Sequence, residues 1–286
     1  MTKVLVAGCG DLGRSVASYF VAQGAQVTGM RRNGIEFPEG VLGITGDLTE
    51  LNQDAWPDAD LVYLIVTPQG RTEEDYHTAY VKAAEAVANA YQMREKVPHV
   101  FFVSSTSVYG QNQGQLITDS SLAVAAKPTA QKLLQAEQVL HQAVPSTAVR
   151  CSGIYGPGRY RLLDGVCNGE PWGPNSWTNR IHRDDVVSSL CFLGERAVRG
   201  LSLPETVIAT DEQPVSMWEV KLWLASSLNV LPPLPENIPF SDYFPTSGKR
   251  IVASCLKTLG WRPTYSSYVS GYGSMLKRYV PPKERA

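Results

Sequence analysis

The stretch from Val4 to Gly13, which reads Val-Leu-Val-Ala-Gly-Cys-Gly-Asp-Leu-Gly, decides the fold of this chain. Its first four residues form a continuous apolar run, which is typical of a strand buried on both faces of a parallel sheet. The glycines at Gly8, Gly10 and Gly13 then follow with G-x-G-x-x-G spacing, and the apolar residues from Leu12 onward have the spacing of one helical face. A strand, a glycine-rich turn and a helix in this order predict a β-α-β unit that binds a dinucleotide.

The residues of this turn have different expected tasks. Gly8 allows the tight turn, Gly10 lets the backbone approach a pyrophosphate, and Gly13 lets the helix pack closely on the strand. Asp11 and Leu12 begin the helix, whose N-terminus offers unpaired N–H groups and the positive end of its dipole to phosphates. The alternative is a glycine-rich turn that holds no ligand.

The end of the second predicted strand indicates which dinucleotide is bound. About 20 residues after the motif, an NAD site carries an acid for the ribose 2′-hydroxyl. This chain has Arg31 and Arg32 there, and its next acid is Glu36. Paired guanidinium groups suit a 2′-phosphate because they form bidentate, charge-assisted hydrogen bonds. We therefore expect NADP(H) as the cofactor; the alternatives are NAD, or two arginines that are merely solvated.

Short β-branched runs alternate with amphipathic stretches as far as Arg150. Thr72 and Asp75 form a capping-box pattern at the start of one of these stretches. Strands that alternate with helices predict the α/β class and a Rossmann-type, doubly wound parallel sheet. The predicted strands cover residues 4–7, 26–30, 41–45, 61–66, 100–103 and 147–149, and the predicted helices start at about 12 and 72 and cover about 129–142.

The composition of the sequence changes after Arg150, and glycine and proline become frequent in 153–158 and 171–174. Ser216 is placed to cap another helix, and 206–209 reads as a strand that returns to the main sheet. We predict a dinucleotide-binding domain over 1–150 and a smaller C-terminal lobe, mainly substrate-binding, over 151–286.

Composition excludes several classes of protein. The chain has 286 residues and a net charge of −1, and nucleic-acid binders usually have a basic excess. No apolar run approaches the roughly 18 residues of a membrane span. The five cysteines are far apart and the four histidines lack ligand spacing, so we expect no metal site, no disulfide framework and a cytoplasmic location.

Several further motifs, in order along the chain, resemble those of one family. They are Gly46-Asp47-Leu48, the segment 101–110 that ends Val-Tyr-Gly, the segment 150–158 that ends Tyr-Gly-Pro-Gly, the segment 179–186 with His-Arg-Asp-Asp, and Gly248-Lys249-Arg250 with Leu259-Gly260-Trp261. Together with the glycine motif they resemble the extended short-chain dehydrogenases/reductases, specifically the NAD(P)-dependent epimerase/dehydratase group and its atypical members, over about residues 2–276.

The resemblance implies roles for residues outside the glycine motif. Asp47, followed by Leu48, would contact the adenine amino group, and Thr67 would line the nicotinamide half of the cleft. Ser105 would occupy the position of the family's catalytic Ser/Thr and hold a substrate oxygen; the alternative is that it caps the next turn. His182, in the segment 179–186, would lie beside the substrate. Independently of the resemblance, Arg150 and Arg159 could meet an anionic substrate, with solvated arginines as the alternative, and Thr106 and Tyr155 are further candidates for substrate contact.

The chain differs from this family at the two residues that carry out the family's proton transfer. The family uses Tyr-x-x-x-Lys, whose tyrosine exchanges a proton and whose lysine lowers the tyrosine pKa. The corresponding stretch, residues 126–133, has no tyrosine. One alignment puts Thr129 and Leu133 at the two positions, and another puts Pro128 and Lys132 there.

The remaining catalytic candidates are therefore Ser105, Tyr109 and Lys132. The literal Tyr-x-x-x-Lys at Tyr279 to Lys283 contains two prolines, which exclude the helical turn that the pair needs.

We expect an NADP(H)-dependent oxidoreductase or epimerase-like enzyme that transfers a hydride to or from a small polar or nucleotide-linked substrate. The alternative is a non-catalytic NADP(H) sensor or regulatory protein, because the proton donor is missing. The small-molecule substrate is the expected partner, and whether the chain forms a homodimer stays open.

Overall fold

The computed structural model describes residues 1–33, 36–234 and 237–282, and the chain divides into two units. The first unit comprises Met1–Gly110, Ala123–Cys151 and Val186–Ile208, and the second comprises Gln111–Leu122, Ser152–Asp185 and Ala209–Ala286. Each unit is thus assembled from separate pieces of the chain. The sequence predicted two successive parts, with only residues 206–209 returning to the main sheet, and that strand does join the sheet as β11. That one part holds a cofactor and the other a substrate stays a prediction.

A seven-stranded sheet forms the centre of the first unit, in the order β11-β7-β5-β4-β1-β2-β3. The pairings with a described register are all parallel. The chain builds outward from β1 to β2 and β3, and then crosses to β4 on the other side of β1. This is the predicted Rossmann-type, doubly wound sheet. The strands are β1 (Lys3–Ala7), β2 (Gln26–Arg31), β3 (Val41–Thr45), β4 (Leu61–Leu64), β5 (His99–Ser105), β7 (Ser146–Cys151) and β11 (Thr206–Ala209).

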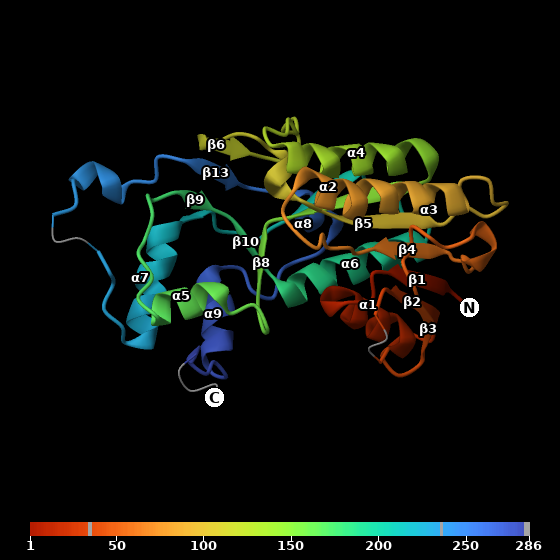
Figure 1. Cartoon of the computed structure of the whole chain (residues 1–286), viewed down its shortest axis with the longest axis horizontal. Coiled ribbons are helices and arrows are strands. Elements are labelled where there is room, and N and C mark those ends of the chain that lie inside the picture. Colours follow the sequence, from red (N-terminus) through yellow and green to blue (C-terminus); the bar gives the residue numbers. More distant parts are fainter. Residues whose placement is uncertain (34–35, 235–236, 283–286) are drawn as a thin grey trace. The chain divides into compact units, whose positions relative to one another are not determined.

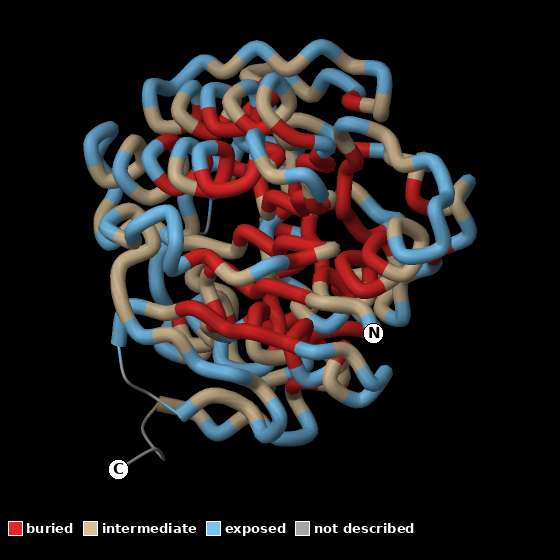
Figure 2. Tube along the Cα trace, turned by 90° about the vertical axis from the view of Figure 1, so that its right-hand side faces the viewer, coloured by how far each residue is buried: buried red, intermediate tan, exposed pale blue. Residues whose placement is uncertain are grey.

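Helices cover both faces of this sheet (Figure 1). Both faces need cover because the central strands are apolar throughout: Val4 to Ala7 and Leu61 to Leu64 are all buried. Figure 2 shows the buried residues in the interior and the exposed ones along the outer turns. One face carries α1 (Asp11–Ala22) and α6 (Arg183–Val198), and the other carries α2 (Glu73–Tyr76), the π-helix η2 (His77–Lys82), α3 (Ala83–Tyr91) and α4 (Pro128–Ala143).

Local signals explain where these helices begin. α1 buries Leu12, Val16 and Phe20, which recur every fourth residue along one face. The capping box predicted at Thr72 is present: the Thr72 hydroxyl accepts from the Asp75 amide at 3.1 Å, and Asp75 accepts from the Thr72 amide at 2.9 Å. The π-helix η2, which follows α2, was not predicted. The strand predicted over 61–66 is shorter in the structure, because β4 ends at Leu64.

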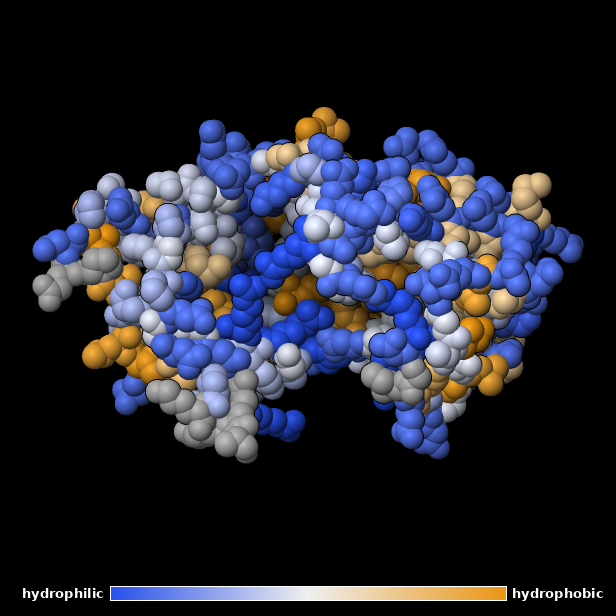
Figure 3. All heavy atoms as spheres, viewed as in Figure 1, coloured by the Kyte–Doolittle hydropathy of each residue, from blue (hydrophilic) through white to orange (hydrophobic). Residues whose placement is uncertain are grey.

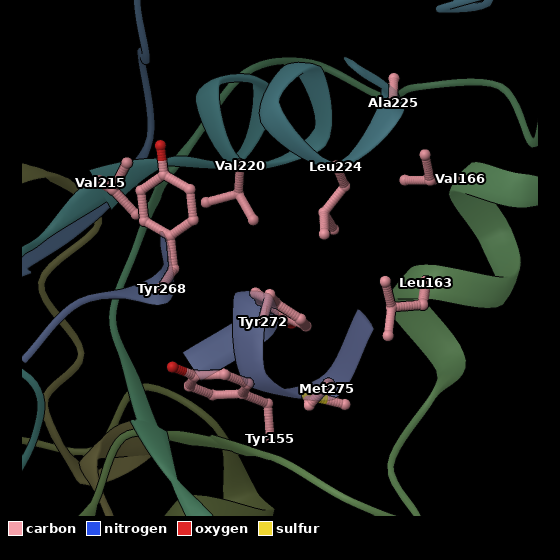
Figure 4. Close-up of a cluster of buried hydrophobic side chains, with 10 residues drawn as sticks. All are labelled: Tyr155, Leu163, Val166, Val215, Val220, Leu224, Ala225, Tyr268, Tyr272 and Met275. Carbon is pink, nitrogen blue, oxygen red and sulfur yellow. The ribbon is translucent and has the colours of Figure 1, made fainter. Parts of the chain in front are cut away.

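The second unit contains short strand pairs and its own core. Its helices α5, α7 and α9 pack around Leu163, Leu224, Tyr272 and Met275, with Tyr155 beside them (Figure 4). The strand pairs are β8 (Gly153–Tyr155) with β10 (Arg180–His182), β9 (Trp177–Thr178) with β12 (Val215–Ser216), and β6 (Gln113–Ile117) with β13 (Gly248–Ile251). The helices of this unit are α5 (Arg161–Cys167), α7 (Met217–Leu228), α8 (Cys255–Leu259) and α9 (Tyr268–Leu276), and η4 (Phe240–Tyr243) is a short 3₁₀ turn. The first unit contains two further 3₁₀ turns, η1 (Gln53–Ala55) and η3 (Thr106–Val108).

The surface is mainly hydrophilic on the face that Figure 3 shows, where hydrophobic residues form separate groups. Within the described part of the chain, no helix has the length and apolar character needed to cross a membrane.

Candidate functional site

A cavity of about 500 Å³ opens in the first unit beyond the carboxyl ends of β1 to β4. This is where ligands bind in open α/β sheets, because the sheet's strand order reverses between β1 and β4. Its volume lies in the range of small-molecule sites. Thr78, Ala79 and Ala83 of η2 and α3 contribute to its wall. The predicted cofactor residues that line it are Gly8, Gly10, Arg31, Arg32, Asp47, Leu48 and Thr67.

The three motif glycines differ in what surrounds them. A Cβ atom on Gly8, whose φ is +103°, would lie 1.9 Å from the carbonyl oxygen of Ile65. A Cβ on Gly13 would lie 2.3 Å from the carbonyl oxygen of Gly8, so the packing of β1, β4 and α1 requires glycine at both positions. A Cβ on Gly10 would meet no protein atom within 4 Å. Packing therefore leaves the Gly10 position open on the side of the cavity.

Backbone hydrogen bonds hold this loop against the end of β2. The amides of Gly8 and Cys9 both donate to the carbonyl oxygen of Met30, at 3.1 and 2.8 Å. The residue after Met30 is Arg31, so the glycine loop and the arginine pair are fixed relative to each other. Asp11 and Leu12 belong to α1, where Leu12 is buried and Asp11 is exposed; neither lines the cavity.

Charged groups of both signs line the cavity. The Nε atom of Arg31 is buried and has no hydrogen-bond partner among the described residues. The carboxylate of Asp47 accepts from the amide and the hydroxyl of Thr49, at 2.9 and 2.8 Å. Burial alone raises the pKa of Asp47, but the Thr49 hydrogen bonds and the charge of Arg32 outweigh it and hold that pKa below its usual value.

These residues fit a dinucleotide. The open space at Gly10 gives room for a pyrophosphate next to the N-terminus of α1. The orphaned Nε of Arg31 offers a buried donor, which is costly to leave unpaired and suits a phosphate oxygen. Asp47, which is ionised, offers an acceptor for an amino or hydroxyl group.

The predicted catalytic residues Ser105, Tyr109 and Lys132 do not line this cavity. The Ser105 hydroxyl accepts from the Ser107 amide at 3.1 Å, and it thereby caps η3. The Tyr109 ring is buried, and its phenol oxygen accepts from Nη1 of Arg150 at 2.9 Å. Thr106, a predicted substrate contact, is also buried.

Lys132 forms an ion pair with a residue of another helix. Its Nζ lies 2.9 Å from a carboxylate oxygen of Glu73, so it joins α4 to α2. Leu133, which one alignment put at the family's lysine position, is buried, and Thr129 is half-buried. No phenol and ammonium pair therefore lies on this part of α4.

A buried network of charged side chains joins α4 to β5 and β7. Glu137 on α4 accepts from Arg150 Nη2 at 2.6 Å, from Arg150 Nε at 3.1 Å and from the Ser104 hydroxyl at 2.5 Å. Burial lowers the pKa of Arg150, but the hydrogen bonds and charge of Glu137 more than offset this and raise it. Sequence reasoning missed Ser104 and Glu137. The available signal was Arg150 in an apolar strand, which requires a buried acid.

Tyr155 and His182, predicted substrate contacts, lie together in the second unit. They are partners in the β8–β10 register, and their rings cross nearly at right angles, with centroids 5.4 Å apart. Burial raises the pKa of Tyr155 well above its usual value, so this phenol is a poor proton donor. Tyr155 also stacks on Tyr272, as Figure 4 shows.

The His182 ring has one nitrogen with a partner and one without. Its Nδ1 accepts from the Asp184 amide at 3.2 Å, while Nε2 is buried and has no hydrogen-bond partner among the described residues. Burial lowers the pKa of His182, which favours the neutral imidazole. Arg159, also a predicted substrate contact, is exposed.

Asp211 is a second buried group of this unit that the sequence did not single out. One carboxylate oxygen accepts from the Gln213 amide at 3.2 Å, and the other is buried without a partner in the described part of the chain. Burial raises the pKa of Asp211 to about 7.

Metal ligands do not gather anywhere in the described residues: no three His, Cys, Asp or Glu side chains are placed to hold an ion. Tyr279 donates to Asp164 at 2.8 Å, and Lys283 lies outside the described residues.

The chain is similar to known proteins in sequence and in fold. The model of the NAD dependent epimerase/dehydratase family matches residues 4–167. Protein YeeZ of Escherichia coli K12 is 30% identical over 209 residues, which cover 68% of this chain and 73% of YeeZ.

Two solved structures extend this similarity over almost the whole chain. A Methylobacillus flagellatus protein, described as an NAD-dependent epimerase/dehydratase, is 32% identical with a TM-score of 0.81, covering 96% of this chain and 98% of that one. The human epimerase family protein SDR39U1, solved with NADPH, has a TM-score of 0.77 and covers 97% of this chain and 100% of its own. At 14% identity, that likeness shows the fold alone.

Proposed function

Because the chain belongs to the NAD dependent epimerase/dehydratase family, we propose that it binds NADP(H) and is an oxidoreductase or epimerase-like enzyme. Its substrate is a small polar or nucleotide-linked molecule. The bound nicotinamide would supply or accept a hydride, and the protein would hold the substrate and transfer the proton that accompanies the hydride.

The orphaned guanidinium nitrogen of Arg31 in the wall of the cavity carries this proposal. An NAD site would carry an acid at this strand end to accept from the ribose 2′-hydroxyl. Arg31 and Arg32 are donors only and carry a positive charge, so they suit the 2′-phosphate of NADP(H). The binding of NADPH by a human protein of the same fold is consistent with this choice.

In this proposal the pyrophosphate lies against Gly8 and Gly10, which line the cavity. Asp11 and Leu12 begin α1, whose N-terminal dipole favours the phosphates, and Gly13 lets α1 pack closely enough to place that terminus there. Asp47, with Leu48 beside it, holds the adenine, and Thr67 lies on the nicotinamide side.

The substrate is held by Ser105, whose hydroxyl hydrogen stays available for a substrate oxygen because the Ser107 amide uses only a lone pair. Thr106, Arg150, Tyr155, Arg159 and His182 are the further candidates. Arg150 acts through the Glu137 network rather than as a free cation. The group that exchanges the proton is unassigned.

Titration of NADPH and NADH against two proteins tests the cofactor assignment. The wild type is expected to bind NADPH more tightly than NADH, and an Arg31→Ala/Arg32→Ala variant is expected to lose most of that difference. Each charge-assisted hydrogen bond is worth about 1.5–3 kcal/mol, so the loss in NADPH affinity should be at least about tenfold. Equal NADPH affinity of the two proteins would disprove the assignment.

A second candidate function, a non-catalytic NADP(H) sensor, is favoured by one observation. Lys132, the nearest ammonium to the family's lysine position, is paired with Glu73, and Leu133 is buried. An enzyme should change the near-ultraviolet absorbance of NADPH with some carbonyl compound or sugar nucleotide. A sensor should bind NADPH without any such turnover.

A further inference from the structure

A second cavity, of about 350 Å³, lies wholly within the second unit, beside the start of α7. Its volume is in the range of small-molecule sites. Its walls come from the loop before β9 (172–175), from Trp218 on α7 and from the segment that follows α7. None of the residues predicted to bind the cofactor or the substrate lines it. The function proposed above therefore leaves this cavity without a role.

Three aromatic side chains line the cavity: Trp172, Trp218 and Phe244. The rings of Trp172 and Trp218 are inclined at 56°, with centroids 6.2 Å apart, so they form an open corner rather than a flat stack. Phe244 is 56% exposed, which places it at the mouth of the cavity. Aromatic rings are negative on their faces, and a group of such faces attracts a cation.

Hydrogen bonds hold this aromatic corner in place. The Trp218 ring nitrogen donates to the carbonyl oxygen of Gly173 at 2.8 Å. Asn175, which is 3% exposed, uses both ends of its amide: Nδ2 donates to the Tyr243 carbonyl at 2.7 Å, and Oδ1 accepts from the Trp218 amide at 3.1 Å. Asn175 thus joins the loop 172–175 to α7 and η4. Because the walls are fixed before a ligand arrives, little entropy is lost on binding.

The charge of the cavity wall selects the kind of ligand. Among the described residues that line the cavity, Asp242 is the only ionisable one. Its carboxylate accepts from the neighbouring Ser241 hydroxyl at 3.0 Å, and it forms no ion pair within the described ranges. The wall therefore offers no cation to a phosphate or a carboxylate. The charge of Asp242 and the faces of the aromatic rings both favour a positively charged ligand.

A side chain of the protein already uses Trp172 in this way. The Nζ atom of Lys221, about one turn after Trp218 on α7, lies 5.5 Å from the centroid of the Trp172 ring. This distance is within the range of a cation–π interaction. Lys221 itself does not line the cavity. A cationic ligand would share the Trp172 ring with Lys221, so the Lys221 charge should weaken its binding.

We propose that this cavity binds a small quaternary ammonium compound of the choline type. Its methyl groups pack against Trp172, Trp218 and Phe244, and Asp242 balances its charge. A quaternary ammonium suits aromatic walls because its surface is apolar and it has no N–H group that needs an acceptor. The phosphate of a choline phospholipid would lie near Asp242 without a cation, which disfavours a lipid headgroup. This inference does not depend on the proposed binding of NADP(H).

The test compares three probes by isothermal titration calorimetry: choline, phosphocholine and 3,3-dimethylbutan-1-ol, which has a neutral carbon in place of the charged nitrogen of choline. The wild type should bind choline at least about tenfold more tightly than the alcohol, because only choline gains the cation–π and ionic interactions. Phosphocholine should bind more weakly than choline.

Two variants test the predicted contacts. Asp242→Asn removes the charge but keeps the shape and an acceptor for the Ser241 hydroxyl. Phe244→Leu removes the aromatic face but keeps an apolar wall. Each should weaken the binding of choline about 2–10-fold and leave the binding of 3,3-dimethylbutan-1-ol unchanged.

A third variant should have the opposite effect. Lys221→Met removes the competing cation at similar length, so choline should bind about two- to fivefold more tightly. The matched control is Glu212→Gln, which removes an acid of the same unit that pairs with Lys257 at 2.6 Å and does not line the cavity. It should change no affinity.

Four outcomes would overturn the inference, and the NADPH titration would stand or fall separately from all of them. If choline fails to bind, or binds no more tightly than the alcohol, the cavity does not recognise a cation. If Asp242→Asn and Phe244→Leu both leave the affinity for choline unchanged, choline binds elsewhere. Tighter binding of phosphocholine would assign the cavity to a phosphate-bearing ligand. Weaker binding of choline by Lys221→Met would mean that the two cations do not compete for Trp172.

Discussion

Truncation of Glu137 to alanine tests the buried charge network of the first unit. Glu137 is 4% exposed and Arg150 is 8% exposed, so bulk water solvates neither charge. In Glu137→Ala, the guanidinium keeps its hydrogen bond to Tyr109 and loses its carboxylate partner, and the Ser104 hydroxyl loses its acceptor. Removing one partner of a buried pair costs about 3–5 kcal/mol, because the other charge stays buried and uncompensated.

Chemical denaturation should therefore show a free energy of unfolding lower by about 3–5 kcal/mol, and the Tm should fall by about 6–20 °C. Glu137→Leu combined with Arg150→Met removes both charges, so it should regain most of this loss. The control is Lys3→Gln, which removes an exposed pair with Asp58 (3.2 Å; side chains 45% and 75% exposed) and should cost less than about 1 kcal/mol.

The result that refutes this reasoning is a cost for Glu137→Ala no larger than that of Lys3→Gln. The reasoning would also be refuted if Glu137→Leu combined with Arg150→Met were less stable than Glu137→Ala. In that case the ion pair would stabilise the fold beyond the mutual compensation of its two charges.

Three further predictions concern single positions. Burial raises the pKa of Asp211 to about 7, so the folded protein keeps a proton that the unfolded chain releases near pH 4. The contribution of Asp211 to the free energy of unfolding therefore falls as the pH rises from about 4 to about 7. Asp211→Asn should therefore stabilise the protein at about pH 8 and leave it unchanged at about pH 4; an equal gain at both would contradict the assignment. Gly8→Ala should lower the free energy of unfolding by about 1–3 kcal/mol or more, because the added Cβ collides with the Ile65 carbonyl oxygen. Gly10→Ala should leave the Tm unchanged and weaken only dinucleotide binding. A lower Tm for Gly10→Ala than for Gly8→Ala would be incompatible with the cavity geometry. Thr72→Ala should lower the free energy of unfolding by about 1 kcal/mol, since it removes a capping box, and an unchanged denaturation midpoint would show that the cap is dispensable.

The sequence predicted most of the first unit because its signals there are local. The run Val4 to Ala7 became β1, the prediction over 41–45 matches β3 residue by residue, and Thr72 caps its helix as the pattern requires. Gly8 and Arg31 were predicted from the local pattern, and Asp47 and Thr67 from the resemblance to the family. All four line the cavity, because each stands at or just beyond a strand end and parallel strands bring those ends to one edge.

The remaining features depend on contacts that no local pattern encodes. Glu137 lies among Gln135 and Gln138 on a helix, where an acid is usually solvated, and only the fold brings it to Arg150. The short strands of the second unit, such as β8 and β10, have too few residues for a period to be read. The functional assignment of Ser105, Tyr109, Lys132 and the substrate contacts accordingly stays a prediction.

The interleaving of the two units has a consequence for any attempt to shorten the gene. A fragment that stops at residue 150 would lack α6 and β11, which the first unit recruits from beyond the second unit's segment 152–185. Tyr63 would lose its hydrogen-bond acceptor, the Leu190 carbonyl at 3.1 Å, and the edge of β7 would be left without its neighbouring strand. Such a fragment should aggregate. The two halves of the reading frame are therefore not separable modules, and an excised first unit must carry the codons for residues 186–208 joined to it.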